Sequence, residues 1–143
     1  MITSSGGKGM SLQVARVMWV VFVCWACGII VMAHMIRRPQ PPTPPPPAFN
    51  RLIAAVAAAD IVVIGLIRRG LLQKSQENVQ RGEAAAGQII WGKAQVMGFA
   101  SAMSVVLFGF LLSMAGARPE WFNTIFYVVG LLLLVSYWPL LAP

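Results

Sequence analysis

The chain has 143 residues, of which 58% are hydrophobic and 10% are charged. A soluble domain carries about 45–50% apolar and about 25% charged residues, so the composition excludes a water-soluble globule and an intrinsically disordered chain. Eleven lysines and arginines against four acids give a formal net charge of +7. In a membrane protein this excess bears first on topology and on anionic lipid, and we expect no nucleic acid partner. The composition predicts a small polytopic integral membrane protein.

Four apolar stretches approach or reach the length of about 20 residues that a helix needs to cross a bilayer. They cover residues 17–36, 52–67, 94–115 and 121–138. The fourth has an aromatic residue at each end, which is typical of side chains at the level of the lipid headgroups. The predicted fold is therefore all-α: a single transmembrane domain over residues 1–143, with four transmembrane helices arranged in two hairpins.

The distribution of lysine and arginine predicts the direction of insertion. Seven basic residues fall in the N-terminal tail and in the loop 68–93, and four fall on the opposite side. The positive-inside rule then places both termini and the loop 68–93 in the cytoplasm, and we expect a bacterial inner (plasma) membrane. Because this loop is rich in helix formers, it should extend the second and third helices beyond the membrane, with a break near Gly82 or Gly87.

The predicted external loop is rich in proline. Residues 39–47 hold seven prolines in nine positions, and such a run adopts an extended polyproline II helix. Two interpretations stay open: a stiff soluble spacer, which we favour, and a strap that docks on a partner.

Asp60 is the one acid within the four predicted spans, and it precedes Arg68 by eight residues. At 1.5 Å per residue it lies about 12 Å from that end of its span, near the bilayer midplane. Desolvation disfavours the charged form, so we expect a neutral Asp60. It could hold two helices together through a hydrogen bond, with Ser101, Ser104 or Cys27 at matching depth. It could also form an ion or proton site with Ser101 and Ser104, or contact another subunit.

Small residues recur at four-residue spacing on the second and third predicted spans. They are Ala55 and Ala59 on the second span, and Ala94, Gly98 and Ala102 on the third. Small faces let helix backbones approach closely where lipid removes the hydrophobic drive to associate. We therefore expect these two helices to pack tightly, against each other or against a second copy of the chain.

Cys24 and Cys27 form a CxxC motif inside the first span, and His34 is the single histidine. A structural metal site needs further ligands, and a redox pair needs an exposed thiolate, which hydrocarbon disfavours. We interpret the cysteines as small buried hydrophobes and His34 as an interfacial side chain. No metal site, cofactor or complete catalytic set is expected, so we do not expect an enzyme.

The stretch AQVMGFASAMSVVLFGFLLSM ends in the aromatic–glycine–apolar run Phe108–Gly109–Phe110. Together with the acid near the midplane and the polar loop, it resembles the proteolipid (c-type) subunits of rotary ATPases over residues 52–67 and 88–115. The resemblance implies that Asp60 is the ion carrier and that the loop 68–93 faces the rotor stalk. This chain departs from that family, because the family's acid lies in the second helix of its hairpin, where this chain has Ser101 or Ser104. It also lacks the dense glycine repeat of the ring-lining helix. The chain is also similar to uncharacterised four-span bacterial membrane proteins.

Two functions stay open at this point. The one we expect is a non-catalytic accessory or scaffold subunit of a larger membrane complex, assembled through small-residue helix faces. Its partners would be other membrane subunits or copies of itself, within the lipid bilayer. The alternative is a proteolipid-like ring subunit that translocates protons or other ions through Asp60. A transporter or channel acting alone fits less well, because one acid and a few hydroxyls make a poor pathway.

Overall fold

In the computed structural model of the chain, the described residues are 10–36, 45–116 and 120–139. Most of the predicted proline-rich loop, residues 39–44, lies outside the described residues. The same holds for four of the basic residues counted above, which are Lys8, Arg37, Arg38 and Arg118.

Four helices make up the described part of the chain: α1 (Leu12–Met35), α2 (Pro47–Gln80), α3 (Ala84–Met114) and α4 (Glu120–Ser136). Ser11 caps α1, because its hydroxyl accepts a hydrogen bond from the Val14 N–H at 3.3 Å. α2 begins at Pro47, where the missing N–H of proline costs nothing. Gly116 follows α3 at φ 69°, a conformation that favours glycine at a helix end.

The all-helical class and the apolar character of the helices are confirmed. α1, α2 and α3 are each long and apolar enough to cross a membrane. α4 has 17 residues, which corresponds to about 25 Å against a hydrocarbon layer of about 30 Å. The chain is therefore a helical bundle with three membrane-compatible helices and a shorter apolar fourth.

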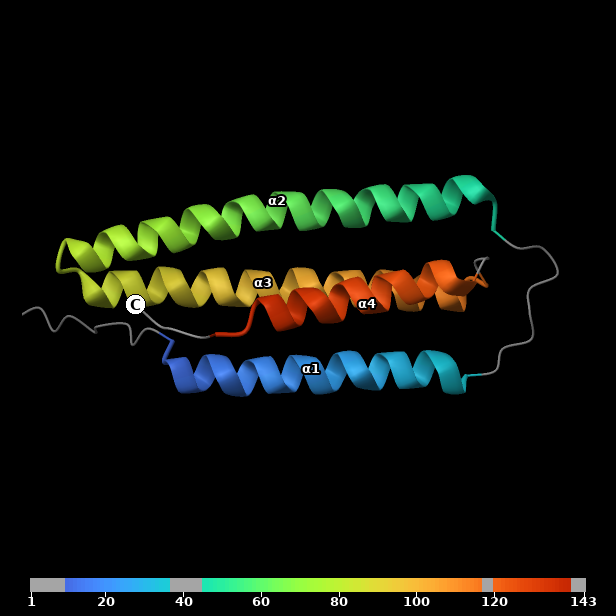
Figure 1. Cartoon of the computed structure of the whole chain (residues 1–143), viewed down its shortest axis with the longest axis horizontal. Helices are drawn as coiled ribbons and strands as arrows, with labels where there is room; N and C mark the ends of the chain where they lie inside the picture. The colour runs from blue at the N-terminus through green and yellow to red at the C-terminus, as the bar shows by residue number, and fades with distance from the viewer. Residues whose placement is uncertain (1–9, 37–44, 117–119, 140–143) are drawn as a thin grey trace, which may run out of the picture.

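α3 is the central helix of the bundle. α2 packs along one side of α3, α4 packs beside α3, and α1 contacts α3 and α4 from the other side (Figure 1). α1 and α2 do not approach each other, so the close antiparallel pairs are α2–α3 and α3–α4. Consecutive helices run in opposite directions, so α1 starts and α4 ends toward the side of the molecule that holds the α2–α3 connection, although α4 ends well short of that connection (Figure 1).

The predicted loop 68–93 is almost entirely helical. α2 continues to Gln80 and α3 starts at Ala84, and the chain reverses between them at Gly82, which has φ 84°. Of the two glycines considered as breaks, Gly82 is therefore the turn. Gly87 lies inside α3, where a Cβ atom would come within 2.6 Å of the Val79 side chain, so it serves close packing of the two helices.

Two buried clusters share α3. The first joins α1, α3 and α4 through Ala26, Phe99, Ala102, Met103, Val106, Tyr127, Leu134 and Tyr137. The second joins α2, α3 and α4 through Ala57, Val105, Leu112 and Phe126. α1 is also attached to the end of α4 by a hydrogen bond, since the Trp19 indole N–H donates to the Leu134 carbonyl at 2.7 Å. α3 is thus buried on most of its circumference, whereas α1 and α2 each bury one side.

The α3–α4 contact depends on two glycines where the backbones approach closely. A Cβ atom at Gly109 would lie 2.9 Å from Phe126 Cβ, and one at Gly130 would lie 2.5 Å from Val106 Cγ2 and 3.1 Å from the Ala102 carbonyl oxygen. These distances leave no room for a methyl group unless the helices separate.

Gly130→Ala is expected to destabilise the bundle by about 1–3 kcal/mol, because it overpacks the α3–α4 contact. The matched control is Gly28→Ala on α1, where nothing lies within 4 Å of an added Cβ atom. Thermal unfolding in detergent, followed by circular dichroism, measures both variants. Equal stability of the two variants would contradict the close α3–α4 approach.

Candidate functional site

The candidate site lies between α2 and α3, where Asp60 meets two serines. The Ser101 hydroxyl lies 2.9 Å from Asp60 Oδ2, and the Ser104 hydroxyl lies 2.8 Å from the same oxygen. Residues three apart share a helix face, so both hydroxyls of α3 reach one carboxyl oxygen of α2. The structure thus brings Asp60, Ser101 and Ser104 together.

The number of hydroxyl hydrogens limits how many hydrogen bonds this cluster can form. The Ser104 hydroxyl also lies 2.8 Å from the Ser101 carbonyl oxygen, which makes three short oxygen–oxygen contacts. Two serine hydroxyls supply only two hydrogens. The Ser101 hydroxyl donates to Asp60 Oδ2, and the Ser104 hydroxyl has two acceptors within reach, Asp60 Oδ2 and the Ser101 carbonyl oxygen. The cluster thus joins α2 to α3 through one carboxyl oxygen and two serine hydroxyls.

A second polar contact lies about two helical turns along α2, at Arg68. Its guanidinium carbon lies 4.5 Å from the centre of the Tyr137 ring, a cation–π contact with the residue that follows α4. Gly98 of α3 makes room for it, since a Cβ atom there would lie 3.0 Å from Arg68 Nε and 3.1 Å from Tyr137 Cδ2. Arg68 comes directly after the predicted second span. Burial lowers its pKa from the ordinary value, and the charge interaction with Tyr137 opposes this shift; arginine still stays protonated at neutral pH.

A third polar contact lies seven residues further on. The buried Ser75 hydroxyl donates to the Gly87 carbonyl of α3 at 2.8 Å. Asp60, Arg68 and Ser75 therefore follow each other at intervals of eight and seven residues along the α3-facing side of α2. This spacing is close to the seven-residue repeat of helices that pack along a shared seam.

The predicted packing residues divide into two groups. On α3, Ala94, Gly98 and Ala102 are buried, as expected for packing positions. On α2, Ala55 and Ala59 are exposed, and the buried alanine is Ala57, with 4% of its surface exposed. α2 and α3 do pack along each other, but through Ala57 and not through Ala55 and Ala59; packing of these two alanines against a second copy of the chain stays a prediction. The physical reason for their exposure is the register of α2, which turns Asp60 and Arg68 toward α3 and leaves those two alanines on the far side.

The interpretation of the cysteines also needs a correction. Cys24 and Cys27 are free and exposed on α1, not buried. α1 contacts α3 and α4 through one side only, around Ala15 and Ala26, and the two cysteines lie on the other side. His34 is exposed, as an interfacial side chain would be, and its ring N–H donates to the Ile30 carbonyl at 2.8 Å. Among the described residues, no three histidine, cysteine, aspartate or glutamate side chains gather where they could hold a metal ion.

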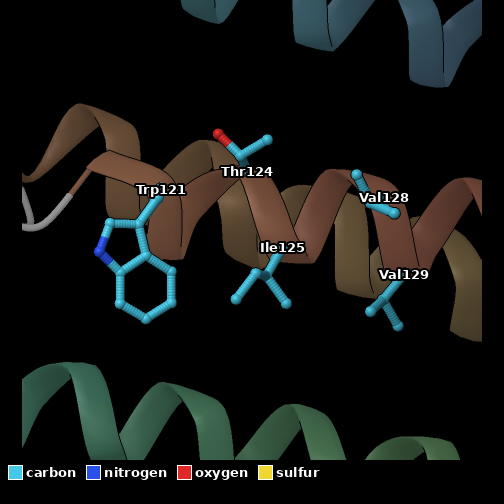
Figure 2. Close-up of a pocket in the computed structure, with 5 residues that line it drawn as sticks. All are labelled: Trp121, Thr124, Ile125, Val128 and Val129. Carbon is cyan, nitrogen blue, oxygen red and sulfur yellow. The ribbon is translucent and has the colours of Figure 1, made fainter.

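A shallow apolar recess lies on α4, away from Asp60. It has a volume of about 330 Å³ and is lined by Trp121, Thr124, Ile125, Val128 and Val129. Figure 2 shows Trp121, Ile125 and Val129 on the side of α4 that faces α2. None of the lining side chains is an acid or a base, so this recess offers no group for proton transfer or nucleophilic attack.

Arg68 and Ser75 both make polar contacts with neighbouring helices, but neither is among the predicted site residues. Both lie beyond the end of the predicted second span, where the hydropathy pattern stops. The signal that could have found them is the seven-residue spacing, which continues from Ile61 through Arg68 to Ser75 in the sequence.

Comparison with protein families, with curated proteins and with solved structures gives no match for this chain.

The hydrogen bond between Asp60 and Ser104 is expected to couple the two residues energetically. Interhelical hydrogen bonds in membrane proteins contribute about 0.6 kcal/mol on average and up to about 1.7 kcal/mol. A double-mutant cycle of Asp60→Leu and Ser104→Ala should therefore give a coupling energy in that range. Unfolding in mixed micelles with increasing denaturing detergent measures it.

The control cycle pairs Asp60→Leu with Ser113→Ala. Ser113 hydrogen-bonds to the Tyr127 hydroxyl at 3.0 Å and does not belong to the Asp60 cluster, so this cycle should show no coupling. Additive effects of Asp60→Leu and Ser104→Ala would mean that the carboxyl group and the serine do not interact in the folded protein.

Proposed function

We propose that this chain is a non-catalytic accessory or scaffold subunit of a larger membrane complex. In this proposal all four helices cross the membrane, consecutive helices in opposite directions, and both termini face the cytoplasm of a bacterial cell. Partner subunits contact the chain through the outward side of α2. Asp60 has a structural role within the chain.

Two features support the four crossings and their direction. α4 lies antiparallel beside α3 and carries Trp121 at one end, with Trp138 just past the other, as interfacial residues do. The basic residues of the described part gather toward the end that holds the α2–α3 turn. They are Arg16, Arg68, Arg69, Lys74, Arg81 and Lys93, against Arg51 near the other end. The positive-inside rule favours a cytoplasmic location for this end.

The observation that carries the proposal is the outward side of α2. A helix turns by about 100° per residue, so Ala55 and Ala59 lie almost opposite the buried Ala57, and both are exposed. The side chains that α2 packs against α3 and α4 lie on its opposite side, around Ala57, and α1 does not approach α2, so Ala55 and Ala59 stay uncovered within this chain. Contact with lipid does not favour small residues there, whereas interfaces between membrane helices are enriched in them, because small side chains let two backbones approach.

The environment of Asp60 supports the same proposal. An ion carrier must meet water or a counter-charge during its cycle. The Oδ2 atom of Asp60 is instead bonded by the hydroxyls of Ser101 and Ser104 on the neighbouring helix of the same chain. These contacts favour a structural acid over an exchanging one.

The alternative is a proteolipid-like ring subunit in which Asp60 translocates protons. Its specific support is the polar cluster itself, since that chemistry requires an acid within the membrane. It differs from the accessory subunit in stoichiometry, because a ring contains many identical copies of one chain. Native mass spectrometry of a gently extracted complex therefore distinguishes the two functions.

Ala55→Leu and Ala59→Leu are expected to release the partner subunits, because the larger side chains keep a neighbouring helix at a distance. The bundle itself should stay folded, since both positions are exposed. The matched control is Ala100→Leu, the same change at an exposed position of α3. Each variant is tagged, extracted from its native membrane in mild detergent and analysed by native mass spectrometry.

The wild-type chain and the Ala100→Leu variant should carry at least one different polypeptide that the two α2 variants lose. Retention of that polypeptide by both α2 variants would contradict a contact through this side of α2. An assembly of identical copies only would contradict the accessory role and favour the ring, and a bare monomer would contradict both.

A further inference from the structure

Arg68 is a cation held at the junction of three elements. It lies on the α3-facing side of α2, its Cδ and Nε atoms border Gly98 of α3, and its guanidinium group stacks on Tyr137 at the end of α4. Its side chain is only partly exposed. The position of the guanidinium group is therefore fixed by packing rather than left to a mobile surface side chain.

This fixed cation lacks an anion within the part of the chain that the structure describes. Its buried Nε atom has no hydrogen-bond partner, and the cation–π contact with Tyr137 is its one polar interaction there. Along α2, Asp60 lies eight residues before it and Glu77 nine residues after it, which corresponds to about 12–14 Å in either direction. A partly buried charge without a partner is costly, and a guanidinium group has five N–H donors to offer.

Other basic residues lie near the same level of the bundle. α1 begins at Leu12, and its Trp19 packs on Trp138, next to the Tyr137 that covers Arg68. Arg16 lies three residues before Trp19, so it is about one helical turn from the level of Arg68. Arg69 follows Arg68 directly, and Arg16 and Arg69 are both exposed. The local charge is therefore positive and attracts an anion.

Aromatic side chains lie at the same depth of the bundle as Arg68. Trp19 and Trp138 pack edge to face with ring centres 4.3 Å apart, and Tyr137 covers Arg68. Tryptophan and tyrosine concentrate at the boundary between hydrocarbon and headgroups. In a membrane-embedded chain this is the depth at which lipid phosphates lie.

We propose that Arg68 binds the phosphate group of an anionic phospholipid, in the leaflet on the side of the α2–α3 turn. The planar guanidinium fork matches phosphate oxygens in a bidentate way, and Arg16 and Arg69 add attraction for the net negative headgroup. The inference rests on the membrane placement of the chain but not on its accessory role. The lipid experiment and the subunit experiment can therefore fail independently.

The test uses the full-length chain, purified in detergent and stripped of lipid. Phosphatidylglycerol or phosphatidylcholine is added in mixed micelles, and the lipid retained per chain is measured by native mass spectrometry. Phosphatidylglycerol should bind with a preference that Arg68→Gln lowers at least about tenfold, as expected for loss of a charge-assisted hydrogen bond. Arg69→Gln is the matched control and should lower binding less than about threefold, as for an exposed charge. Arg68→Lys should restore only part of the binding, because it keeps the charge and loses the fork.

A second measurement does not depend on any variant. Brominated phosphatidylglycerol should quench the tryptophan fluorescence of the wild-type chain more strongly than brominated phosphatidylcholine does, since Trp19 and Trp138 lie near Arg68. Equal quenching by the two lipids would overturn the proposal. Equal loss of binding in Arg68→Gln and Arg69→Gln would also overturn it, because binding would then follow total charge. Displacement of the lipid by millimolar inorganic phosphate would overturn the lipid assignment in favour of a free anion.

Discussion

The arrangement of the bundle depends on the polar seam between α2 and α3. In lipid, apolar surfaces gain little by leaving their surroundings, so close packing and hydrogen bonds decide how helices pair. Asp60, Arg68 and Ser75 provide such contacts along one side of α2, and each meets a different part of α3. Because the three contacts are spread over four turns, a shift of α2 by one turn or a rotation about its axis would break all of them. The seam therefore fixes both the register and the rotation of α2.

This register explains the remaining architecture. With one side of α3 occupied by α2, α4 approaches α3 from another side at Gly109 and Gly130, where no methyl group fits. α1 completes the bundle through contacts with α3 and α4 and stays apart from α2. The same register directs Ala55 and Ala59 outward. One set of polar contacts thus determines which helix face is available to lipid or to another subunit.

The sequence alone predicted the helices and identified Ser101 and Ser104 of α3, with Cys27, as candidate partners of Asp60, for a simple reason. The length of an apolar segment predicts a membrane-spanning helix. Counting residues from the ends of two such segments then gives the depth of each polar group in the membrane. The direction of the small residues could not be predicted in the same way. A four-residue spacing places small residues on one face of a helix but does not say what that face contacts, so both α3 and a second copy of the chain stay open for Ala55 and Ala59. Arg68 and Ser75, which help to fix the rotation of α2, follow the apolar segment. Hydropathy therefore does not identify them as residues of the α2–α3 contact.

The central claim is that Asp60 and the seam face α3, with Ala59 facing outward, and cysteine cross-linking tests it most directly. In a chain with Cys24→Ser and Cys27→Ser, the pair Asp60→Cys and Ser101→Cys is compared with the pair Ala59→Cys and Ser101→Cys in native membranes, using a short bifunctional thiol reagent. We predict an intramolecular cross-link for the first pair and none for the second. A cross-link formed by the second pair but not by the first would show that α2 has a different rotation, and would contradict this account.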